Sequence, residues 1–174
     1  MGKRSLSATS NDHIPRLVRP RERFFFSSWP TVDQTVTQPF AANPDYYGQF
    51  CNPYCLPGHE GIDIRAPEGT PIYAVADGEV YMVQTDPSTS NYGVQVRLQH
   101  IDGYKSIYAH LSAVNVKDAQ PVSAGAIIGW SGNTGNSFGA HLHLTLKRYG
   151  ATAAGLTDYP YDIIDPTPYL AHIL

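Results

Sequence analysis

Residues Ala140–Lys147 read Ala-His-Leu-His-Leu-Thr-Leu-Lys, and this stretch decides the fold. Successive side chains of a β-strand point to opposite faces, so the leucines would line one face while His141, His143 and Thr145 line the other. The leucine face suits a hydrophobic core, and the histidine face suits an open site. The alternation therefore predicts a half-buried strand that carries two imidazoles on one side.

The same period of two recurs in other segments. Tyr92–His100 and Tyr104–Leu111 both alternate, and they flank the turn signal Asp102-Gly103, which together predict a hairpin. Further strands are predicted at Gly78–Thr85 and Pro121–Trp130. No segment in the body of the chain sustains a helical period over the usual length. The sequence therefore predicts a mostly β fold with an antiparallel sheet as its core.

Length and charge divide the chain into two parts. A chain of 174 residues fits one domain with a short appendage. The first 24 residues hold six Lys or Arg against two acids, a net charge of +4, so the remainder carries −7 of the total of −3. We expect residues 1–34 to form a basic, partly extended arm and residues 35–174 to form the folded domain. We expect the arm to be solvated rather than bound to nucleic acid.

Targeting signals are weak in this sequence. No run of about 18 apolar residues occurs, so a transmembrane helix is not expected. Lys3 and Arg4 could begin a secretory signal, but no apolar stretch of about 7–15 residues follows them. No signal peptide is therefore predicted. Delivery by secretion, to the periplasm or by a phage all stay open.

A second histidine pattern precedes the first in the chain. In an extended segment, His59 and Asp63 share a face, while Ile62 and Ile64 point the other way into a core. Gly58, Gly61 and Pro67 argue against a helix here. The pattern therefore predicts an imidazole and a carboxylate that point into one groove.

A third pattern is Tyr108-Ala109-His110-Leu111, in which alternation places Tyr108 and His110 on one face. Two neutral imidazoles and one carboxylate are a usual set of protein ligands for a catalytic zinc ion. The remaining histidines could then move a proton or stabilise an oxyanion. Each pattern alone is weak, but together they favour a metal site over ordinary surface residues.

These residues also carry a family resemblance, which extends from about Val36 to Leu170. The chain closely resembles the lysostaphin-type (LytM-like) zinc endopeptidases in five short motifs. They are Gly58-His59-Glu60-Gly61-Ile62-Asp63, Gly69-Thr70-Pro71-Ile72-Tyr73-Ala74, Tyr108-Ala109-His110-Leu111, Ser131-Gly132-Asn133-Thr134-Gly135 and Gly139-Ala140-His141-Leu142-His143. In combination these motifs are highly specific.

The resemblance implies a function and a role for each residue. His59, Asp63 and His143 would bind Zn²⁺, and His110 and His141 would act on the attacking water and the oxyanion. An aromatic residue upstream of the first ligand assists in some relatives, and Tyr54 lies near that place. The implied fold is an open β-sheet groove of the duplicated hybrid motif type. The implied activity is hydrolysis of peptide bonds in peptidoglycan cross-bridges or stems, at the cell wall. We also expect the protein to be a monomer.

Two alternative hypotheses assign the chain to other classes of protein. One is a non-catalytic wall-binding or amidase-activating domain on the same scaffold, although its degenerate members have lost metal ligands that this chain retains. The other is a sugar-transport phosphocarrier domain, which also uses two histidines. That class needs neither an aspartate four residues after a histidine nor a His-x-His pair.

Other notable residues have simpler explanations. Cys51 and Cys55 could form a disulfide, remain free thiols or bind a second metal, and their spacing does not decide among these. His100 is expected to be a hydrogen-bonded core histidine or a support for a metal ligand. Trp130 and the tyrosines at 46, 47, 73 and 92 are expected to be packing residues.

Overall fold

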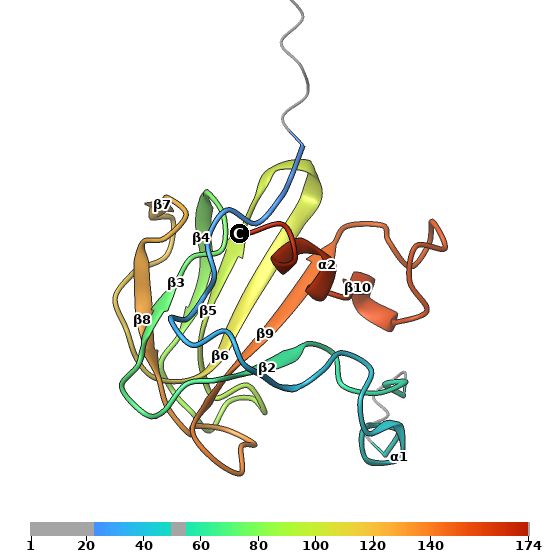
Figure 1. Ribbon diagram of the computed structural model, residues 1–174, viewed down its shortest axis with the longest axis horizontal. Coiled ribbons are helices and arrows are strands. Elements are labelled where there is room, and N and C mark those ends of the chain that lie inside the picture. Colours follow the sequence, from blue (N-terminus) through green and yellow to red (C-terminus); the bar gives the residue numbers. More distant parts are fainter. Residues whose placement is uncertain (1–22, 50–54, 174) are drawn as a thin grey trace, which may run out of the picture.

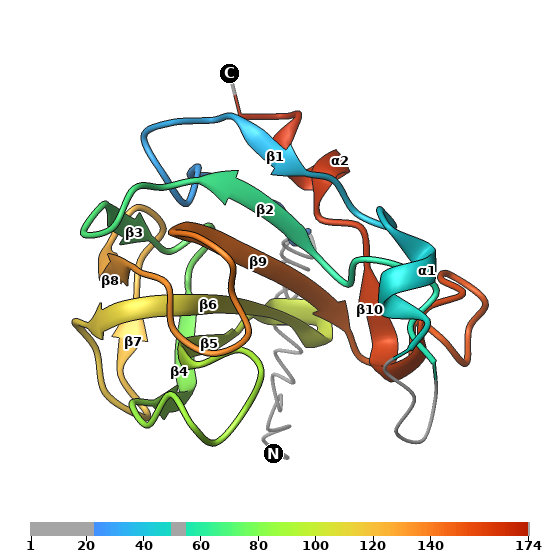
Figure 2. The same ribbon diagram turned by 90° about the horizontal axis from the view of Figure 1, so that it is seen from below.

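A computed structural model describes residues 23–49 and 55–173. Within these residues ten strands form one open antiparallel sheet, and the helices are single turns. The order along the main path is β1-β2-β9-β6-β5-β4-β7 (Figures 1 and 2). The predicted antiparallel β core is therefore confirmed. In order along the chain, the elements are β1 Val36–Gln38, α1 Pro44–Tyr47, β2 Ile62–Arg65, β3 Pro71–Tyr73, β4 Gly78–Gln84, β5 Val94–Gln99, η1 Ile101–Gly103, β6 Tyr104–Val114, β7 Pro121–Val122, β8 Ile127–Ser131, β9 His141–Arg148, η2 Pro160–Asp162, β10 Ile163–Ile164 and α2 Thr167–Leu170.

The strand formed by the deciding stretch lies at the centre of the sheet. β9 pairs with β2 on one side and with β6 on the other. Leu142, Leu144 and Leu146 are fully buried in the core, as the alternation predicted. The opposite face of β9 carries the two histidines, Thr145 and Lys147. The sheet around β9 therefore has one apolar face packed against the core and one polar face.

The predicted hairpin is confirmed, whereas one predicted strand is divided. β5 and β6 pair antiparallel from Val94 to Gln99, and η1 supplies the turn. The expected strand Pro121–Trp130 is wrong as a single element, because it forms the separate strands β7 and β8. Gly125 lies between them with a φ of +78°, a left-handed conformation that interrupts an extended strand.

The segment before β1 completes the core. In Figure 1 the blue segment crosses the face of the sheet near α2. Phe24 stacks on Tyr104 with ring centroids 4.0 Å apart, and Phe26 packs 5.5 Å from Tyr169. The aromatic residues of this segment thus belong to the folded body. Residues 1–22 lie outside the described part, so the extent of the basic arm stays a prediction.

Neighbouring phenylalanines provide a test of this packing. Phe26 is 1% exposed and Phe25 is 61% exposed. Phe26→Ala should lower the free energy of unfolding by about 3–5 kcal/mol, because it leaves a cavity in the core. Phe25→Ala should change it by less than about 0.5 kcal/mol. Urea denaturation of both variants measures the difference, and equal effects would show that this segment is not part of the core.

Candidate metal centre

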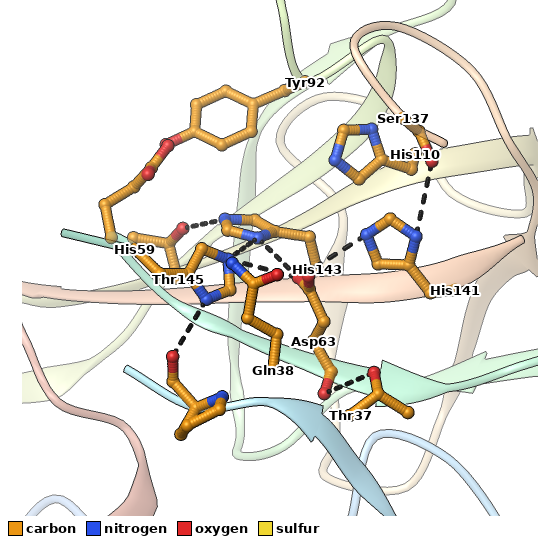
Figure 3. Close-up of polar contacts among 12 residues, drawn as sticks. Thr37, Gln38, His59, Asp63, Tyr92, His110, Ser137, His141, His143 and Thr145 are labelled. Atoms are coloured by element: carbon orange, nitrogen blue, oxygen red, sulfur yellow. Dashed lines mark hydrogen bonds and ion pairs between the residues drawn. The ribbon is translucent and has the colours of Figure 1, made fainter. Parts of the chain in front are cut away.

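Three predicted ligand residues meet where β2 pairs with β9 (Figure 3). Asp63 lies directly opposite His143 in the antiparallel register, and His59 comes just before β2. The Nδ1 atom of His143 is 2.9 Å from the Oδ1 atom of Asp63. The Nε2 atom of His59 is 3.2 Å from the same oxygen and 2.9 Å from the Nδ1 atom of His143.

These three atoms form a triangle of the size that a metal ion requires. Ligand atoms bound at roughly 2.0–2.2 Å to a tetrahedral zinc ion stand about 3.3–3.6 Å apart. The observed edges of 2.9, 3.2 and 2.9 Å are slightly shorter than this. Two imidazoles and one carboxylate also match the chemistry of a zinc site with an open fourth position. The residues therefore fit the ion.

Hydrogen bonds outside the triangle set the tautomers of its two histidines. The Nδ1–H of His59 donates to the carbonyl oxygen of Pro39 at 3.2 Å, because a carbonyl can only accept. This leaves a lone pair on Nε2 for a metal. The Nε2 atom of His143 lies 2.8 Å from the hydroxyl of Thr145, away from the triangle.

The direction of the His143 hydrogen bond follows from a chain that ends on a carboxylate. Tyr92 donates its hydroxyl proton to Oε1 of Glu60 at 3.2 Å, since a carboxylate only accepts. The Tyr92 oxygen then accepts from Thr145, whose oxygen accepts from the Nε2–H of His143. The Nδ1 atom of His143 is thereby left unprotonated and faces the triangle. Such outer contacts are what orient metal-binding histidines.

The two further histidines lie beside the triangle. The rings of His110 and His141 have centroids 4.8 Å apart. The Nδ1–H of His141 donates to the carbonyl oxygen of Gly139 at 2.7 Å, and its Nε2 atom is 3.5 Å from Oδ1 of Asp63. The Nδ1–H of His110 donates to the carbonyl oxygen of Thr134 at 2.7 Å. Both rings are thus anchored through Nδ1, and their Nε2 atoms remain for chemistry.

His110 reaches the site through a break in its strand. β6 pairs with β9 as far as Ala109 and then with β8 from Leu111 onward. His110 lies at this change of partner with a φ of +60°, a left-handed conformation that is uncommon for a side chain of this size. The prediction that Tyr108 and His110 share a face is wrong, because this conformation ends the alternation. Tyr108 lies in the core, where its hydroxyl accepts the N–H of Val75 at 2.9 Å.

Glycines allow close approach around the histidines. A Cβ atom on Gly61 would lie 2.9 Å from Cε1 of His143 and 2.5 Å from the carbonyl oxygen of Leu144. A Cβ atom on Gly135 would lie 2.4 Å from the backbone nitrogen of Gly93. The loop between β8 and β9 can therefore pack against Gly93, and this contact places the Thr134 carbonyl that holds His110.

The local electrostatics separate the two further histidines. Burial, assisted by the neighbouring His143, lowers the pKa of His110 to about 4. Burial would also lower the pKa of His141, but its contact with Asp63 and the Gly139 carbonyl outweighs this and raises it. Burial would raise the pKa of Asp63, yet the three surrounding imidazoles hold it well below its ordinary value. Near pH 6, His110 is thus neutral and Asp63 is ionised.

A groove of about 680 Å³ surrounds these groups. Asn43, Tyr46 and Tyr47 form one side, and the loop residues 136–140 form another. The Tyr47 ring lies 5.2 Å from the ring of His59, and its hydroxyl accepts from Nε2 of Gln38 at 2.9 Å. Tyr46, Tyr47 and Tyr92 line the groove and also pack against neighbouring rings.

Three other expectations from the sequence remain. Tyr54, expected near the first ligand, and Cys51 lie outside the described residues, so the Tyr54 role and the state of the Cys51–Cys55 pair stay predictions. His100 is buried away from the groove, where its ring nitrogens contact the Asp77 carbonyl at 2.7 Å and the Ser106 hydroxyl at 2.8 Å. This confirms His100 as a hydrogen-bonded core histidine.

Comparisons with known proteins agree with this geometry. The Peptidoglycan DD-endopeptidase ShyA of Vibrio cholerae is 47% identical over 88 residues, which are 51% of this chain and 20% of that protein. This chain therefore spans about a fifth of the length of that relative. The catalytic domain of the antimicrobial peptidase lysostaphin from Staphylococcus simulans is 35% identical, with a TM-score of 0.56 over 66% of this chain and 80% of that one.

A further solved structure is described as a zinc-containing peptidase from Vibrio cholerae. It is 30% identical, with a TM-score of 0.57 over 71% of this chain and 36% of that one. The model of peptidase family M23 matches residues 57–154, more than half of the sequence and the part that holds all five histidine and aspartate positions of the site. The chain belongs to peptidase family M23.

Proposed function

We propose that this chain is a zinc-dependent endopeptidase that hydrolyses peptide bonds in bacterial peptidoglycan. The observation that carries this proposal is the triangle of His59, Asp63 and His143 with two anchored imidazoles beside it in an open groove. The names of the relatives support the substrate, since ShyA is a peptidoglycan DD-endopeptidase and lysostaphin is an antimicrobial peptidase. Action at the cell wall follows from that substrate.

We assign the metal to the triangle and the proton chemistry to the two further histidines. When bound there, Zn²⁺ would supply Lewis acidity toward a substrate carbonyl and lower the pKa of a water molecule to about 7. His110 is neutral and its Nε2 atom can accept the proton of that water. His141, whose pKa is raised, can donate a hydrogen bond from Nε2 to the developing oxyanion. Opposite pKa shifts in adjacent groups are typical of an acid–base pair.

The non-catalytic alternative has less support. An amidase-activating or wall-binding domain needs no ordered ligand triangle, whereas here four histidines are anchored by outward hydrogen bonds. Within residues 23–49 and 55–173, no helix is long and apolar enough to span a membrane. A monomeric state and the route of delivery to the wall stay predictions.

Variants of four of the five site residues test the proposal directly. His143→Ala and Asp63→Ala should lose bound zinc, because a three-ligand site cannot spare one ligand. His110→Ala and His141→Ala should retain zinc but hydrolyse purified peptidoglycan about 10²-fold more slowly or worse. Metal analysis after dialysis gives the zinc content, and mass spectrometry of the released fragments gives the rate and the bond that is cut.

The wild-type protein provides the reference for both measurements. Zinc-loaded wild type that releases no peptide fragments from walls of several cross-link types would refute the enzyme proposal. A variant of His110 that loses zinc while His143→Ala keeps it would instead require the roles to be exchanged.

The hydrogen-bond chain through Thr145 gives a separate prediction. Thr145→Val removes the acceptor for the Nε2–H of His143 and should weaken zinc affinity about 10–100-fold. Thr145→Ser keeps a hydroxyl in the same place and should bind zinc nearly as well as wild type. Competition with a chromogenic chelator measures both affinities, and equal losses in Val and Ser variants would contradict the orienting role.

The pKa of His110 predicts how the metal-free protein responds to acid. Its imidazole should titrate near pH 4 in a nuclear magnetic resonance experiment, against an ordinary pKa of 6.5. Because the unfolded chain then binds the proton more readily, this group lowers the free energy of unfolding as the pH falls from about 6.5 toward about 4. His110→Gln should reduce that loss, and a midpoint above 6.5 would refute the prediction.

A further inference from the structure

Three cationic side chains lie together on the sheet face that carries the candidate metal centre. Lys105 lies directly opposite Lys147 in the pairing of β6 with β9, and Arg97 of β5 is opposite Ile107, two residues farther along β6. Like charges directly opposite one another destabilise a sheet. Among the described residues, none of these three makes a salt bridge with a carboxylate. We call Arg97, Lys105 and Lys147 the cationic patch.

Each cation of the patch is held over an uncharged aromatic ring. The Arg97 guanidinium lies 5.7 Å from the centre of the Tyr92 ring. The Lys105 ammonium lies 4.7 Å from the centre of the Tyr81 ring, and the Lys147 ammonium lies 5.8 Å from that of Tyr161. The rings therefore order the three side chains without neutralising their charge.

Groups near the patch offset only part of its charge. Asp162 does attract Lys147, but its two carboxylate oxygens already accept the N–H groups of Gly150 and Thr152 at 3.0 Å each. Burial and the two other cations lower the pKa of Lys147 more than Asp162 raises it. A carboxylate that bound here would therefore relieve a repulsion built into the fold.

Tyr92 lies between the groove and the patch, whose three cations do not themselves line the groove. The Tyr92 ring lines the groove, with its centre 5.5 Å from that of His143, and Arg97 lies over the same ring. Lys147 follows His143 by four residues on β9, which corresponds to about 13 Å along an extended strand. A peptide bound in an extended conformation advances by about 3.3 Å per residue, so about three or four of its residues span this distance.

We propose that the cationic patch binds a carboxylate of the peptide substrate, about three or four residues from the bond that is cut. The inference rests on the proposed peptidase function and assigns a specificity site to it. Continuity with the groove through Tyr92 favours a carboxylate of the same peptide over a separate phosphate polymer.

Paired peptides test the patch. We compare a synthetic stem peptide that has free carboxylates with the same peptide as carboxamides. Each is titrated calorimetrically into zinc-loaded protein in a His141→Ala background, which slows turnover. The free-carboxylate peptide should bind about tenfold or more tightly than the carboxamide peptide. Lys147→Met or Arg97→Gln should each remove most of this preference. Lys117→Met, which removes one exposed lysine outside the patch, should leave it unchanged.

Steady-state kinetics of the single patch variants, with His141 intact, separate binding from chemistry. Lys147→Met should raise KM for the free-carboxylate peptide about tenfold and leave kcat unchanged. An unchanged preference in both patch variants would overturn the inference, as would failure of the free-carboxylate peptide to bind. Loss of affinity only for a glycerol-phosphate polymer would also overturn it. Wild type that binds the carboxylate selectively but cleaves neither peptide would refute the proposed peptidase function instead.

Discussion

The antiparallel register of β2 and β9 places Asp63 opposite His143, and the candidate metal centre depends on this pairing. A slip by one residue would turn both side chains to the other face of the sheet. The register is held by the core beneath it, because Ile62, Ile64 and the leucines of β9 are fully buried there. Gly61 has no side chain to keep His143 away. Aliphatic packing on one face thus fixes the polar geometry on the other.

Burying a carboxylate among three imidazoles is costly unless every polar atom has a partner. The structure meets this requirement by directing the outer ring nitrogens to the Pro39, Thr134 and Gly139 carbonyls and to Thr145. Each imidazole then has one defined tautomer. The inner nitrogens of His59 and His143 are left with lone pairs that face Oδ1 of Asp63. This arrangement favours a cation at the centre, which is the physical basis of the proposed zinc site.

The sequence predicts those parts of the structure that follow from alternation. The faces of β9 and the hairpin of β5 and β6 could be predicted in this way. The convergence of His59, Asp63 and His143 was implied by the family resemblance, and metal binding itself stays a prediction. Alternation did not predict the position of His110, which only the family resemblance implied, because this position depends on a left-handed residue where β6 changes partner. Tyr47 could not be chosen over other tyrosines, since its place follows from a single helical turn packed beside His59. Three consecutive phenylalanines have no period that would identify Phe26 as core.

Tyr92 contacts both the candidate metal centre and the cationic patch. Its hydroxyl is part of the hydrogen-bond chain that sets the tautomer of His143, and its ring supports Arg97. Replacing Tyr92 would therefore alter zinc affinity and the cationic patch together, and neither role could be identified from the result. Thr145 and Lys147 lie on the same face of β9. Thr145 contacts the metal ligand His143, whereas Lys147 is part of the cationic patch. A variant of Thr145 therefore changes the metal centre, and a variant of Lys147 changes the cationic patch. Independent effects of these two variants would distinguish metal orientation from substrate recognition.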